Sequence, residues 1–169
     1  MATISHRGNP IHTSGELPTV GSKAPAFKLV DKDLKDVGLE AFAGKKKLLN
    51  IYPSIDTPVC AMSTKKFNDH AAADPDCVML MIASDLPFAF NRFCGNEGLS
   101  NVRTLSLMRG GRFAEDYGVR IVDGVLAGIC ARAVVVLDRG DVVRYTELVP
   151  ETAQEPDYMK AIAALKALA

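Results

Sequence analysis

The sequence lacks the features that define several classes of protein. Its 20 basic residues balance its 20 acidic residues, so it has no excess of positive charge of the kind that binds nucleic acid or anionic membranes. It also has no uninterrupted apolar run of about 20 residues, the length that a membrane-spanning helix needs. We therefore expect neither nucleic acid nor a membrane as a partner. With 48% hydrophobic residues, the chain is typical of a soluble globular protein.

Cysteine and histidine are few and widely spaced. The four cysteines are Cys60, Cys77, Cys94 and Cys130, and no CxxC pair occurs among them. This spacing excludes the dense disulfide framework of a small secreted protein, so we expect any disulfide to be transient. The three histidines share no zinc-ligand spacing with the cysteines, and we expect no metal and no cofactor.

The chain shows no sign of division or of export. Its first ten residues contain no apolar segment of the kind that a secretory signal peptide requires, which predicts a cytoplasmic protein. No linker, repeat or low-complexity segment interrupts the 169 residues, a length that suits one domain with a substantial core. We expect one domain over residues 1–169.

Hydrophobic patterns predict strands that alternate with helices. A Gly-Asn-Pro turn predicts an N-terminal β-hairpin within residues 1–14. The other predicted strands are 27–30, 45–52, 77–83, 102–107, 133–137 and 142–149. The predicted helices begin at residue 58 and span 87–94, 112–117 and 156–168. This order indicates an α/β fold of three layers with a mixed central sheet, and a thioredoxin-like core is the natural candidate.

The run PSIDTPVC at residues 53–60 carries the strongest chemical signal. Pro53 ends a buried strand, Thr57 is a favourable N-cap, and Pro58 suits the first position of a helix. Cys60 then lies in the first helical turn, where unpaired backbone N–H groups and the helix dipole favour an anion. This environment favours thiolate, the reactive form of cysteine.

A second interpretation of Cys60 is an inert core residue, which is common for buried cysteines. Helical spacing places Cys60, Thr64 and Phe67 on one face that points into the protein. A cysteine at a helix start leaves the two interpretations about even. The succession of strand, proline, loop and Thr-Pro-x-Cys favours a nucleophile.

Several ordered motifs resemble one family over nearly the whole chain. The pattern PxxxTxxC from Pro53 to Cys60 is similar to the peroxidatic motif of peroxiredoxins. The further motifs are NIYPSIDTPVC at 50–60, DLPFA at 85–89, RFCG at 92–95, ARAVVV at 131–136 and EPDY at 155–158. Together they resemble the bacterial thiol peroxidases, which are atypical two-cysteine peroxiredoxins.

The resemblance implies a thioredoxin-like fold, a homodimer, and reduction of hydrogen peroxide and organic hydroperoxides with thioredoxin as reductant. It implies that Cys60 is the peroxidatic cysteine and that Cys94 is the resolving cysteine, which form an intramolecular disulfide. It further implies that Thr57 and Arg132 complete the peroxide site and that Pro53 shields the thiolate from water.

The residue types fit these implied roles. Arg132 would supply a permanent charge that favours thiolate and the charge developing on the peroxide. The Thr57 hydroxyl could position the peroxide. Cys94 lies near a helix C-terminus, with Gly95 as the expected cap, where the dipole disfavours thiolate. Because Cys94 is distant from Cys60 in the sequence, we expect disulfide formation to require local unwinding.

The sequence leaves more than one role open for some residues, and more than one function open for the protein. Cys77 and Cys130 are better explained as small core residues, although Cys130 could act as another thiol near Arg132. Arg92 fits either the polar network of the site or the surface. A redox sensor would use the same Cys60 and Cys94 chemistry as a peroxidase. A general disulfide oxidoreductase is disfavoured because the chain has no CxxC.

Overall fold

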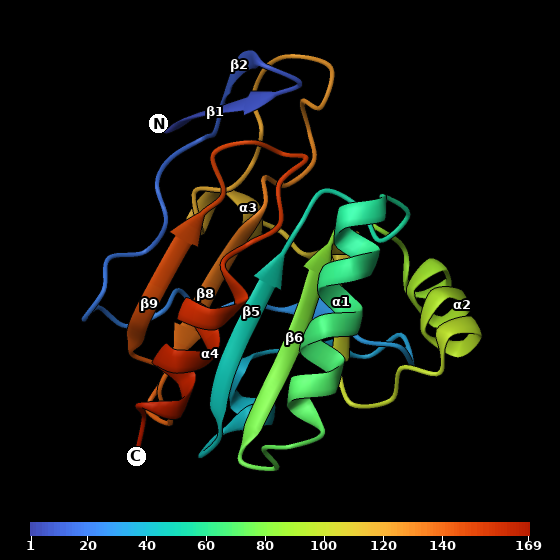
Figure 1. Cartoon of the computed structure of the whole chain (residues 1–169), viewed down its shortest axis with the longest axis vertical. Coiled ribbons are helices and arrows are strands. Elements are labelled where there is room, and N and C mark those ends of the chain that lie inside the picture. Colours follow the sequence, from blue (N-terminus) through green and yellow to red (C-terminus); the bar gives the residue numbers. More distant parts are fainter.

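The computed structural model describes residues 1–169 as a mixed seven-stranded sheet, a separate N-terminal hairpin and surrounding helices (Figure 1). The hairpin consists of β1 (Thr3–His6) and β2 (Asn9–His12). The sheet strands are β3 (Leu29–Val30), β4 (Asp36–Val37), β5 (Lys46–Ile51), β6 (Cys77–Ala83), β7 (Arg103–Ser106), β8 (Ala133–Leu137) and β9 (Val143–Leu148). The α-helices are α1 (Pro58–Ala71), α2 (Pro87–Glu97), α3 (Phe113–Asp116) and α4 (Tyr158–Lys166).

The sheet has the strand order β4-β3-β7-β6-β5-β8-β9. β5, β6 and β7 are parallel neighbours, whereas the β5–β8, β8–β9, β3–β7 and β3–β4 pairs are antiparallel. Every residue of β5 is buried, as Leu48, Leu49 and Ile51 predict for a strand covered on both faces. Lys46, Lys47 and Asn50 are buried polar residues of the same strand. The mixed central sheet is therefore confirmed, and β5 is an inner strand between β6 and β8.

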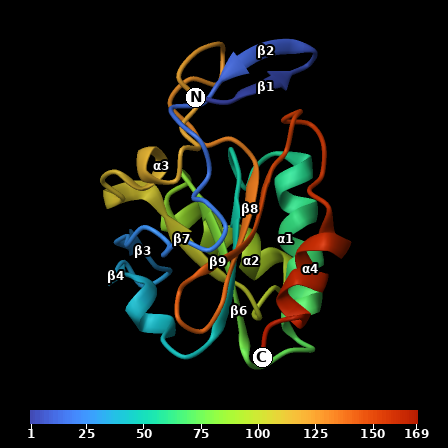
Figure 2. The ribbon, with the colours of Figure 1, turned by 90° about the vertical axis from the view of Figure 1, so that its left-hand side faces the viewer.

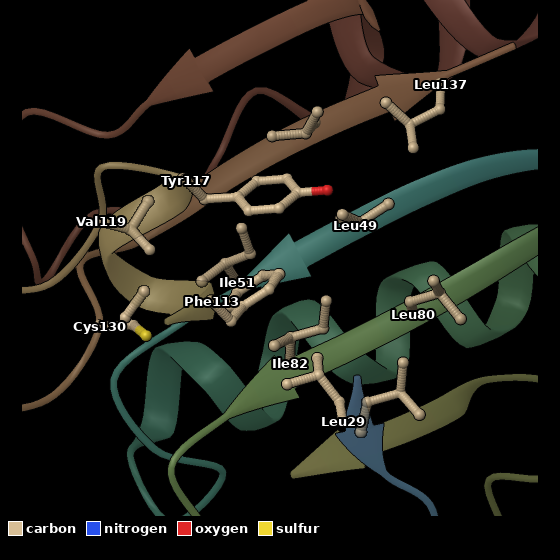
Figure 3. Packing of buried hydrophobic residues seen from close by; sticks show 14 of the residues in the cluster. Leu29, Leu49, Ile51, Leu80, Ile82, Phe113, Tyr117, Val119, Cys130 and Leu137 are labelled. Carbon is tan, nitrogen blue, oxygen red and sulfur yellow. The ribbon is translucent and has the colours of Figure 1, made fainter. Parts of the chain in front are cut away.

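The two faces of the sheet support two hydrophobic cores. Leu49 and Ile51 of β5 belong to the first core, which packs against α3, and Figure 3 shows Phe113 and Tyr117 of that region facing these strand residues. Leu48 belongs to the second core, which includes residues of α1, α2 and α4. Figure 2 shows α1 and α4 on one side of the sheet and α3 on the other. This arrangement is the expected three-layer α/β fold.

The N-terminal hairpin packs beyond one end of the sheet (Figure 1). Ile4 and Ile11 form a small core with Ile121 and Ala131. Apolar contact therefore anchors the hairpin on the segment that leads into β8. No helix in the structure is long and apolar enough to cross a membrane.

The structure corrects the predicted end of α2. Gly95 lies inside this helix, which continues to Glu97 and ends at Gly98, whose φ of 65° is left-handed. The Leu99 N–H donates to the Cys94 carbonyl at 2.9 Å, the hydrogen bond that accompanies a left-handed glycine just beyond a helix end. The same segment contains two glycines, and the sequence pattern predicted the wrong one as the cap.

Short elements were also missed. β4 spans only two residues, and the 3-10 helices η1 (Leu39–Phe42) and η2 (Leu107–Arg109) fill parts of two connections. Elements this short have too few residues to show a hydrophobic period. The helices and long strands that position the site lie where the sequence predicts them.

Candidate active site

The loop between β5 and α1 is fixed from a neighbouring strand end. Pro53 is buried. The Asp85 carboxylate accepts hydrogen bonds from the Ser54 hydroxyl at 2.7 Å and from the Ile55 N–H at 2.8 Å. Asp85 follows β6, the parallel neighbour of β5, so both segments leave the same edge of the sheet. These contacts set the direction in which α1 begins.

Cys60 lies in the first turn of α1 and is fully buried, with 0% of its surface exposed. Arg132 is 2% exposed, and its Nη1 lies 3.3 Å from the Cys60 Sγ. Arg132 directly precedes Ala133, which pairs with Ile51 at the end of β5. The antiparallel pairing of β8 with β5 therefore brings the start of β8 beside the loop that follows β5.

The Arg132 guanidinium is held by few groups. Its Nε and Nη2 donate to the Thr152 carbonyl at 3.3 and 2.9 Å, and no carboxylate forms a salt bridge with it. A buried cation is costly unless an anion or hydrogen-bond acceptors compensate it. The Cys60 sulfur is the one contacting group that can become an anion, so the site favours thiolate there.

Thr57 occupies the N-cap position of α1, as the sequence predicts, but its side chain makes no capping hydrogen bond. Its hydroxyl instead donates to the Ser54 carbonyl at 3.1 Å. A hydroxyl that donates one hydrogen bond keeps its oxygen lone pairs available as acceptors. The half-buried Thr57 side chain can therefore accept a hydrogen bond from a small protonated ligand.

Cys94 lies in the last turn of α2, is half-buried, and is not bonded to another cysteine. Burial raises the pKa of the Cys94 thiol, so the protonated form is favoured, as the sequence predicts. The cause is desolvation of the thiol, whereas the sequence predicted an effect of the helix dipole. Cys60 and Cys94 both contact the second core. A cavity of about 520 Å³ borders Cys94 and includes Asn91, Leu99 and Arg103 in its lining.

The other two cysteines lie outside this arrangement. Burial raises the pKa of Cys77 and that of Cys130 to about 12. Cys130 lies in the first core, beside Val119 and Phe113 (Figure 3), whereas Cys60 lies in the second. Despite its closeness to Arg132 in the sequence, Cys130 is thus a core residue of the opposite layer.

Arg92 lies on the surface, where it pairs with Asp56 at 3.1 Å while 63% of its side chain is exposed. It makes no contact with Cys60 or Arg132. Of the two interpretations left open by the sequence, the surface one fits this geometry. The ion pair does, however, join α2 to the loop before α1.

Sequence reasoning missed the residues that support the site. Thr152 holds Arg132 through its backbone carbonyl, which any residue could supply, so no residue-type signal exists for it. Asp85 was noticed only within the DLPFA motif, although an acidic residue after a buried strand is a recognisable signal. Tyr52, which accepts a hydrogen bond from Thr64 at 3.2 Å, was assigned only to a strand.

Comparisons with known proteins agree with this geometry. Residues 19–162 match the family model described as Redoxin. The chain is 55% identical over 167 residues to the thiol peroxidase of Mycobacterium tuberculosis, covering 99% of this chain and 100% of that protein. The thiol peroxidase of Mycobacterium bovis matches to the same extent.

Two solved structures share the fold over nearly their full lengths. The peroxiredoxin-like protein from Aquifex aeolicus has a TM-score of 0.94 at 38% identity and covers 100% of this chain and 98% of its own. The thiol peroxidase from Chromobacterium violaceum has a TM-score of 0.89 at 26% identity, with coverages of 97% and 95%.

The chain has a thioredoxin-like sheet and, at the start of a helix, a buried cysteine that contacts an arginine. Together with the family match, these features define it as a redoxin, which is a class of oxidoreductases. Within that class, the chain belongs to the thiol peroxidase family of peroxiredoxins. The predicted family, fold and type of enzyme are confirmed.

The different surroundings of the thiols predict how they react with an alkylating reagent. In the native protein near neutral pH, iodoacetamide should modify Cys94 faster than Cys77 and Cys130, because Cys94 is only half-buried whereas the other two are buried and their pKa is about 12. All four cysteines should react once the chain is unfolded. Peptide mass mapping distinguishes them, and native labelling of Cys130 as fast as that of Cys94 would contradict this structure.

Proposed function

We propose that the protein reduces hydrogen peroxide and organic hydroperoxides with Cys60 as the peroxidatic cysteine and Cys94 as the resolving cysteine. The observation that carries this proposal is the contact of 3.3 Å between the Arg132 guanidinium and the Cys60 sulfur inside a closed site. A permanent cation beside a buried thiol stabilises the thiolate that attacks peroxide. Membership of the thiol peroxidase family gives independent support.

In the first step, the Cys60 thiolate attacks one peroxide oxygen and the O–O bond breaks. The sulfur is oxidised to sulfenic acid, while the other oxygen leaves and takes up a proton to become water or an alcohol. Arg132 donors stabilise the charge that develops on these oxygens. Thr57 accepts a hydrogen bond from the peroxide and aligns it with the sulfur.

The reaction also requires movement, because Cys60 is fully buried. Peroxide reaches the sulfur when the loop of residues 53–57 opens beside Pro53. In the closed site, that proline excludes water from the thiolate, and exclusion of water strengthens the interaction of the thiolate with Arg132.

In the second step, the Cys94 thiol condenses with the Cys60 sulfenic acid, which forms a disulfide and releases water. Cys94 lies in the last turn of α2, and helix ends open at lower free energy than helix centres. Local unwinding there allows its sulfur to approach. Thiol exchange with thioredoxin then returns both cysteines to the reduced state.

We further propose a cytoplasmic homodimer. Leu86 and Phe88, at the start of α2, are 49% and 63% exposed, and large exposed apolar side chains are candidates for a subunit interface. The family resemblance supports the same state. A sedimentation mass of one chain at all protein concentrations would contradict the dimer.

Substitution of the two cysteines separates the steps. Cys60→Ser should abolish peroxide reduction, because a serine hydroxyl is not ionised at neutral pH. Cys94→Ser should permit one stoichiometric oxidation to sulfenic acid but prevent sustained turnover with a thioredoxin reducing system. Peroxide consumption and trapping of sulfenic acid measure these outcomes, and full turnover by Cys60→Ser would exclude the assignment.

Arg132→Lys tests the role of the guanidinium. Lysine keeps the charge but loses the planar fork that contacts the Cys60 sulfur and the Thr152 carbonyl together. We expect the second-order rate constant with hydrogen peroxide to fall about 100-fold, the scale seen when one preorganised donor is removed. Stopped-flow kinetics measure it, with Arg92→Lys as a surface control. An unchanged constant in Arg132→Lys would remove this residue from the site.

A further inference from the structure

We propose that Glu151 is a positioning residue for peroxide reduction. Its side chain fixes the N-terminal hairpin against the segment around Thr152, and this segment orients Arg132. The inference rests on the proposed roles of Cys60 and Arg132. Glu151 touches neither residue. It acts through the backbone of Thr152, whose carbonyl oxygen accepts two of the hydrogen bonds of the guanidinium.

Arg132 depends on that single carbonyl for its orientation. The Thr152 oxygen accepts from Nε at 3.3 Å and from Nη2 at 2.9 Å, and this pair of bonds directs Nη1 toward the Cys60 sulfur. Since no salt bridge holds the guanidinium elsewhere, a displacement of the Thr152 peptide would displace the charge beside the sulfur. Misplacement of a catalytic group by about 1 Å can lower a rate by about 100-fold.

The hairpin holds the Thr152 peptide from its other side. The Thr152 N–H donates to the Ser5 carbonyl at 2.9 Å, and the Ser5 N–H donates to the Pro150 carbonyl at 2.7 Å. Ser5 and Glu151 form a parallel β-bridge. His6 Nδ1 lies 2.7 Å from the Thr152 hydroxyl. The segment around Glu151 is thus an added strand on β1.

The Glu151 side chain binds the turn of the hairpin. Its carboxylate accepts the Arg7 N–H at 3.1 Å, the Gly8 N–H at 3.2 Å and the Ser5 hydroxyl at 2.7 Å. Arg7 and Gly8 both have positive φ, of 52° and 79°, as a tight hairpin turn requires. For Arg7 this conformation costs about 1–2 kcal/mol, and the hydrogen bonds to the carboxylate favour it.

Glu151 also organises its own loop. Its carboxylate accepts the Ala153 N–H and the Thr152 hydroxyl, each at 3.2 Å. The Ser5 hydroxyl bond, followed by the backbone N–H bonds, lowers the pKa of Glu151 to about 2. The carboxylate is therefore charged, and an acceptor only, near neutral pH.

Asp123 provides a matched control. It ties the same hairpin to another loop, through the His12 N–H at 2.8 Å and His12 Nδ1 at 2.6 Å, and it makes no bond to the segment of Thr152. Asp123→Ala therefore removes one hairpin anchor of the same kind but no hydrogen bond of the segment around Thr152. Glu151→Ala removes a hairpin anchor together with the bonds that its carboxylate makes to the Thr152 hydroxyl and the Ala153 N–H.

The test compares the reaction with peroxide in Glu151→Ala, Asp123→Ala, Arg132→Lys and the double variant Glu151→Ala/Arg132→Lys. We expect Glu151→Ala to lower the second-order rate constant with hydrogen peroxide about tenfold or more. Asp123→Ala should change the rate constant less than twofold. In the Arg132→Lys background, Glu151→Ala should add less than a twofold loss, because a residue that acts through Arg132 has little further effect once that fork is gone.

Three outcomes would overturn the proposal. One is an unchanged rate constant in Glu151→Ala, and another is an equal loss in Asp123→Ala, which would indicate a general effect of the hairpin. The third is a full tenfold loss in the Arg132→Lys background. Failure of the proposed function is distinguishable from these, because Cys60→Ser would then still turn over peroxide.

Discussion

The site depends on one buried contact, that of the Arg132 guanidinium with the Cys60 sulfur. The guanidinium is almost fully buried, has no carboxylate partner, and is held by a backbone carbonyl. A fixed charge in such a place is unfavourable unless an anion or hydrogen-bond acceptors compensate it. The Cys60 sulfur is the contacting group that can become an anion. In the proposed mechanism, the energetic cost of the buried Arg132 cation thereby favours the thiolate form of Cys60, the proposed nucleophile.

The rest of the fold brings these two groups together and holds them. β5 leads into the loop of Pro53 and then into α1, which carries Cys60, while β8 pairs with β5 and is preceded by Arg132. Asp85 fixes the loop from the end of β6. On the far side, the segment around Thr152 receives the guanidinium and rests on the N-terminal hairpin. The hairpin, which looks peripheral in Figure 1, is connected by hydrogen bonds through Thr152 to the Arg132 guanidinium.

The sequence was sufficient for the main elements and for the family. Apolar runs identified β6 and β8 because buried strands of a central sheet show almost no polar interruption. Leu48, Leu49 and Ile51 identified β5 despite its polar residues, and the Thr57-Pro58 pair identified the start of α1. It was insufficient for contacts between segments. The hydrogen bond from Arg132 to the Thr152 carbonyl uses backbone atoms, and the end of α2 depended on which of two glycines adopts positive φ. The roles of Cys60, Cys94, Thr57, Arg132 and Pro53 stay predictions that the geometry supports.

The most direct measurement is a double-mutant cycle on the free energy of unfolding, with Cys60→Ala, Arg132→Met and both together, at neutral pH in the reduced protein. If the thiolate compensates the buried guanidinium, Cys60→Ala leaves that charge without its anion, and the added Arg132→Met change should recover stability. The account predicts a coupling free energy of at least about 2 kcal/mol between the two residues. Effects that add to within about 0.5 kcal/mol would show that the two residues are not coupled and would contradict it.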